Sequence, residues 1–134
     1  MKKYLLVLLI CFSAGVVLGK KPAFQLKFGS GGGFTGQTIT YTLNSDRTFS
    51  KEESLGHKTA TLDKVKGKDI CQVRKLLKKV NFALLNIDKP GDMSSFIILD
   101  QDGKEYKTVW TGAQPQNADL AALNNKLQSL IPHK

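Results

Sequence analysis

Histidine and cysteine are scarce in this chain of 134 residues, which has two of each. His57 lies beside Lys58 in a polar stretch and His133 is next to last, so neither has a partner at the spacing of a metal site or a catalytic triad. We therefore expect no catalytic residue, no bound metal and no cofactor. A small hydrolase remains an alternative, less favoured because no constellation of poised groups is recognisable.

Paired carboxylates with the spacing of an active site are also lacking. Glu52 and Glu53 are adjacent, which on a strand sends them to opposite faces. Four aspartates, Asp88, Asp92, Asp100 and Asp102, do not follow the spacing of a calcium loop. Turn positions explain these aspartates better than a cation site does.

Long apolar runs are confined to the N-terminus. Lys2 and Lys3 precede an apolar run over 4–12 and then small residues, which is the pattern of a secretory signal peptide. We expect residues 1–19 to be the signal peptide and 20–134 to form one domain, exported to the periplasm or secreted. An uncleaved anchor is one alternative, and lipid attachment at Cys11 is another, which the bulky Ile10 disfavours.

Cys71 is the cysteine that remains after cleavage, so no disulfide can form within the mature chain. The fold must then be stabilised by apolar burial. Cys71 falls beside the apolar stripe of an expected helix, and we expect a buried structural thiol there.

Negative charge is in the minority, since 20 Lys and Arg face 11 Asp and Glu for a net charge of +9. Basic residues do not alternate with aromatic ones as they do in single-strand binders, so we expect no nucleic-acid partner. Attraction to an anionic membrane or an acidic protein fits an exported basic chain better. Solubility alone is also an adequate reason for the charge.

Alternating apolar and polar residues predict strands over 23–28, 37–43, 48–53, 95–100 and 105–110, with an edge strand over 57–62. Helical spacing predicts a helix capped by Asp69 and a second helix from Ala118 that ends before Pro132. Asp102-Gly103 between two strands predicts a hairpin. The expected fold is α+β, an antiparallel sheet of about five to six strands with two helices packed on one face.

The most unusual stretch is Gly29-Ser30-Gly31-Gly32-Gly33-Phe34-Thr35-Gly36, with five glycines among eight residues. We expect a loop between the first two strands, serving either as a plain turn or as a binding loop. It lacks the Gly-Lys-Ser/Thr ending of a phosphate loop. Phe34 is either a tether that packs on the sheet or an exposed anchor for a partner.

Gly32-Gly33-Phe34-Thr35-Gly36 between two strands resembles the signature of the emfourin family, protein inhibitors of thermolysin-like metalloproteases. The resemblance extends to the stretch Val80-Asn81-Phe82-Ala83-Leu84-Leu85, to the Asp102-Gly103 hairpin and to the leucine-rich final helix. It implies a monomeric inhibitor that blocks the cleft of a metalloprotease with Gly32, Gly33, Phe34, Thr35 and Gly36. Thr35 departs from the alanine that is usual in the family.

The alternative function is a non-enzymatic binding module of the cell envelope. Its surface would be the basic face of the middle helix, formed by Arg74, Lys75, Lys78 and Lys79. This face would contact another protein or the periphery of an anionic membrane.

Overall fold

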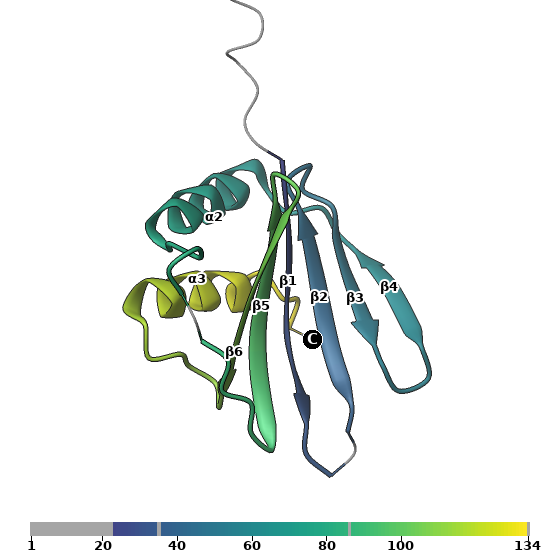
Figure 1. Ribbon diagram of the computed structural model, residues 1–134. Helices are drawn as coiled ribbons and strands as arrows, with labels where there is room; N and C mark the ends of the chain where they lie inside the picture. Colours follow the sequence, from purple (N-terminus) through teal and green to yellow (C-terminus); the bar gives the residue numbers. More distant parts are fainter. Residues whose placement is uncertain (1–22, 35, 86, 134) are drawn as a thin grey trace, which may run out of the picture.

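The computed structural model describes residues 23–34, 36–85 and 87–133, so the expected signal peptide and Thr35 lie outside it. The described residues form a six-stranded antiparallel sheet with both helices on one face (Figure 1), which confirms the α+β fold. In chain order the elements are β1 (Phe24–Gly32), β2 (Thr38–Asn44), β3 (Phe49–Glu53), β4 (Lys58–Leu62), α2 (Gly67–Lys79), β5 (Met93–Gln101), β6 (Lys104–Thr111) and α3 (Ala118–Ser129). No helix in this part of the chain is both long and apolar enough to cross a membrane.

The strands lie in the order β4-β3-β2-β1-β5-β6, and each neighbouring pair is antiparallel. The expected edge strand is indeed at one edge, as β4. The expected Asp102-Gly103 hairpin joins β5 to β6, and both residues have positive φ, 54° and 73°. Strand β1 is central, because it pairs with β2 on one side and with β5 on the other.

The core lies between the sheet and the two helices. Leu26 and Phe28 alternate with polar residues along β1 and are fully buried on the helix-covered face. The same face carries aromatic rings in contact, since Phe28 stacks on Tyr41 at 5.5 Å and on Phe49 at 6.1 Å between ring centroids. The helices contribute buried apolar side chains at Ile70, Val73, Leu120, Leu123 and Leu127.

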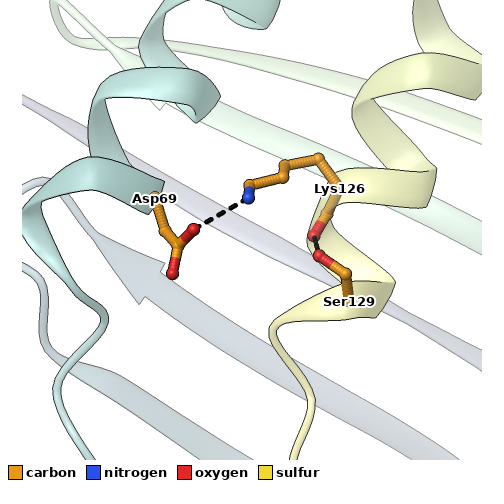
Figure 2. Close-up of polar contacts among 3 residues, drawn as sticks. All are labelled: Asp69, Lys126 and Ser129. Carbon is orange, nitrogen blue, oxygen red and sulfur yellow. Dashed lines mark hydrogen bonds and ion pairs between the residues drawn. The ribbon is translucent and has the colours of Figure 1, made fainter.

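Helices α2 and α3 are joined by an ion pair that the sequence did not predict. The Asp69 carboxylate accepts a hydrogen bond from Lys126 Nζ at 2.8 Å (Figure 2), and this bond is the main reason why the pKa of Asp69 is lowered. The prediction that Asp69 caps α2 was wrong. The helix begins at Gly67 with Lys66 as its N-cap, and no side chain caps it.

Two asparagines connect helix α3 to the chain around its start. Asn117 caps it by accepting a hydrogen bond from the Leu120 N–H at 3.0 Å. The buried Asn124 donates from its amide to the Ala113 carbonyl at 3.1 Å, which holds the segment between β6 and the helix. A buried amide is stable here because that donor is paired.

The prediction of a buried Cys71 was wrong, because the thiol is exposed on α2. The apolar stripe of the helix runs through Ile70, Val73 and Val80, which are buried. Cys71 lies one residue off that stripe, on the side of Arg74, Lys75 and Lys78, which follow it at three, four and seven positions. The fold therefore does not use the cysteine for packing.

Candidate functional site

The first half of the glycine run, Gly29 to Gly32, is strand and not loop. The expected first strand ended at Phe28, whereas β1 continues to Gly32. It pairs with β2 as far as Gly31 and with β5 as far as Gly32. Gly29 lies opposite Thr40 of β2 and Phe96 of β5. The prediction of a loop over the whole run was therefore wrong, and Gly31 and Gly32 form the end of the central strand.

Close approach of neighbouring backbones explains why side chains are missing there. A Cβ atom at Gly29 would lie 1.9 Å from the Ile39 carbonyl oxygen, and one at Gly32 would lie 2.2 Å from the Asp92 carbonyl oxygen. Gly32 also has a φ of 108°, which L side chains rarely adopt. Part of the predicted binding loop is thus required by packing within the sheet.

The hairpin tip connects β1 to β2, and the structure describes residues 33, 34, 36 and 37 of it. The Gly33 N–H donates to the Asp92 carbonyl at 2.6 Å, and the Gly32 N–H donates to the Gln37 carbonyl at 3.3 Å. The Gly36 N–H donates to the Gly33 carbonyl at 3.3 Å. These bonds fix the base of the tip to β5 and close the turn.

Phe34 stands at this tip with its side chain in solvent, at 112% of the reference exposure. The interpretation of Phe34 as a tether packed on the sheet was therefore wrong. The side chain has the exposure that an anchor requires, and its contact with a partner stays a prediction. A ring that makes no core contact adds nothing to the stability of the fold. Exposed aromatic side chains are the kind that serve as anchors in protein interfaces.

Two further exposed apolar side chains lie at the same end of the sheet. Met93 begins β5 opposite Gly32, and Leu55 lies in the β3–β4 turn, which is joined to β2 by the Ser54 N–H bond to the Thr38 carbonyl at 3.0 Å. Figure 1 shows both hairpins and the start of β5 at the lower end of the sheet. We call Phe34, Met93 and Leu55 the apolar end.

Sequence reasoning missed Met93 and Leu55. Met93 follows the Pro90-Gly91-Asp92 break, so its place at a strand start was readable. Its nearness to the glycine run depends on the pairing of β1 with β5, which is a contact between distant parts of the chain. A shallow groove of about 270 Å³ runs beside the tip, lined by Met93, Phe34 and residues 30–33 among others.

The predicted basic face of α2 is hollowed. Lys75, Lys78 and Lys79 are exposed and Arg74 is half-buried, with its guanidinium carbon 5.0 Å from the centre of the Phe24 ring. Arg74, Lys75 and Lys78 border a groove of about 300 Å³ where α2 passes the end of the sheet, whereas Lys79 does not line it. The four residues therefore do not form one flat surface.

Reactive groups are not brought together in the part of the chain that the structure describes. No three His, Cys, Asp or Glu side chains within it are placed to hold a metal ion. Glu53 instead forms an ion pair with Lys51 at 2.7 Å on the same face of β3. His57 lies in the β3–β4 turn with a φ of 49°.

No family model, no curated protein and no solved structure matches this chain. The functional argument accordingly starts from the geometry of the hairpin tip and the groove beside α2.

Proposed function

We propose that this protein is an exported inhibitor that blocks the cleft of a thermolysin-like metalloprotease with its β1–β2 hairpin tip. The observation that carries the proposal is the full exposure of Phe34 at the end of a hairpin whose first strand is central in the sheet. The resemblance of Gly32 to Gly36 to the emfourin signature supports the class of target. The signal pattern over 1–19 supports export.

A cleft-blocking role needs a projecting segment that is already ordered before binding. The hydrogen bonds from Gly32 and Gly33 hold the base of the tip, so less conformational entropy is lost on association than with a free loop. Glycines leave the main chain narrow enough to enter a cleft and offer N–H and C=O groups to an enzyme that binds extended peptides. Phe34 would then fill an apolar subsite while Met93 and Leu55 pack at the rim.

The test is an inhibition titration of thermolysin-like proteases with the purified protein and its Phe34→Ala variant. We expect the wild type to inhibit at micromolar concentration or below. The variant should bind at least about 30-fold more weakly, because a buried aromatic anchor contributes roughly 2 kcal/mol or more. Its free energy of unfolding should stay within about 0.5 kcal/mol of wild type, since the ring is exposed in the free protein.

Leu84→Ala provides a matched control, because Leu84 is also a large apolar side chain, 80% exposed, that lies outside the apolar end. This variant should inhibit like the wild type. An absence of inhibition across several such enzymes would count against the target class. Equal inhibition by the wild type and the Phe34 variant would rule out the tip as the contact.

A further inference from the structure

We propose that the groove beside α2 binds a small anionic amphiphile, a carboxylate or phosphate group attached to a short hydrocarbon chain. The groove is about 300 Å³ and lies between α2 and the ends of β1 and β5. It is separate from the hairpin tip, which is at the opposite end of β1, so this inference does not depend on protease inhibition.

The floor of the groove is apolar. Phe24 is 5% exposed and Leu77 is half-buried, and both line the hollow. The Arg74 guanidinium lies over the Phe24 ring at 5.0 Å, so the positive charge is held directly above the apolar floor. A ligand that fits must therefore place a hydrocarbon group on the apolar floor and a polar or anionic group next to the guanidinium.

The rim of the groove is basic. Arg74, Lys75 and Lys78 lie on one side of α2, and among the residues that the structure describes no Asp or Glu lines the groove. Basic residues in the last turn of a helix also favour its dipole, and that reason applies to Lys78 and Lys79. It does not account for Arg74 and Lys75, which lie beside the same apolar hollow as Lys78. Charge complementarity points to an anionic head group.

The size of the groove favours a small ligand over a flat membrane surface. Ligand sites in proteins span roughly 300–1,000 Å³, so this groove is at the lower limit. A single short chain fits that range, whereas a membrane would contact exposed charges such as Lys79 as well. The proposal therefore commits to a monomeric amphiphile, with a carboxylate and a phosphate as the two head groups to distinguish.

Cys71 lines the groove and is exposed, so its alkylation reports on occupancy. The experiment uses the full chain with Cys11→Ser, which leaves one thiol, and measures the rate of Cys71 modification by iodoacetamide with mass spectrometry. Octanoate should slow the reaction in a saturable manner, by about fivefold or more when the groove is filled. Octanol and octylammonium should give clearly less protection. Octyl phosphate in place of octanoate shows which head group binds better.

Two double variants of α2 with the same change in charge separate the groove from general electrostatics. Lys75→Gln with Lys78→Gln removes two cations at the groove and should weaken octanoate binding by roughly fivefold. Lys68→Gln with Lys79→Gln removes two exposed cations of the same helix outside the groove and should leave binding within about twofold. Circular dichroism checks that both variants are folded.

Three results would overturn the proposal. Equal protection by octanol would show that the anion is not recognised, and equal weakening in both double variants would show that only net charge matters. Protection of Cys71 by anionic phosphatidylglycerol vesicles, with none from octanoate or octyl phosphate, would assign the basic face to a membrane surface instead.

Discussion

Replacement of Gly29 by alanine tests whether close packing of neighbouring strands requires glycine at this position. The added Cβ would lie 1.9 Å from the Ile39 carbonyl oxygen, where carbon and oxygen atoms that are not bonded need about 3 Å. That oxygen belongs to the backbone of β2, so no side-chain rotation can relieve the contact. Strands β1 and β2 would have to separate at the centre of the sheet.

We expect Gly29→Ala to lower the free energy of unfolding by about 3 kcal/mol, the upper part of the range for overpacking. In a domain of this size such a loss lowers the melting temperature by roughly 10 °C or more. Gly67→Ala is the matched control, because Gly67 is the first residue of α2 and a Cβ there meets no atom within 4 Å. It should be neutral or stabilise by about 0.5 kcal/mol.

Gly36→Ala separates backbone strain from crowding. Gly36 has a φ of 63° but open space around it, so alanine should cost only about 1 kcal/mol. Thermal and urea unfolding followed by circular dichroism measure all three variants. If Gly29→Ala were as stable as Gly67→Ala, β1 would not run through the glycines, and the stretch would have to be a loop.

Two further predictions concern the helices. The pKa of Asp69 is lowered in the folded state by Lys126, so the ion pair stabilises fully above the ordinary carboxyl value of 3.8 and loses its effect as pH falls below it. Lys126→Met should therefore lower the free energy of unfolding by about 0.5–1 kcal/mol at pH 7, and by progressively less as the pH of the urea titration falls below 3.8. A difference independent of pH would contradict this. Asn124→Ala should lower the free energy of unfolding by about 1–2 kcal/mol, because the Ala113 carbonyl loses its hydrogen-bond donor. Asn125 is exposed, so Asn125→Ala should have nearly the wild-type free energy of unfolding in the same urea titrations.

Much of the fold follows from residue order. Alternation along β2 and β3 and the Asp102-Gly103 turn predicted local elements that the structure contains, because those signals are held within a few neighbouring residues. Alternation could not predict the strand within the glycine run, because glycines have no side chains that alternate between apolar and polar. Only the positions of β2 and β5 on either side reveal that Gly29 and Gly31 are strand.

The candidate site was predicted less well than the fold. Phe34 is the one large apolar residue in the glycine run, but the sequence does not show whether its side chain is buried or exposed. The place of Cys71 was readable, because Arg74, Lys75 and Lys78 follow it at helical spacing and mark the outer side of the helix. The pairing of Asp69 with Lys126 joins residues 57 positions apart, and no local pattern encodes it.

The central place of β1 also bears on how long the hairpin tip survives near a protease. A peptide bond is cut only when a stretch of chain opens into an extended, unpaired form. The base of the tip is hydrogen-bonded to Gln37 and Asp92, and the strand β1 behind it pairs with both β2 and β5, so an opening that extends into β1 must disrupt both pairings. Such an opening should approach the cost of global unfolding, and amide hydrogen exchange at β1 should be among the slowest in the domain. The edge strand β4, which pairs with β3 alone, should exchange faster and be nicked first.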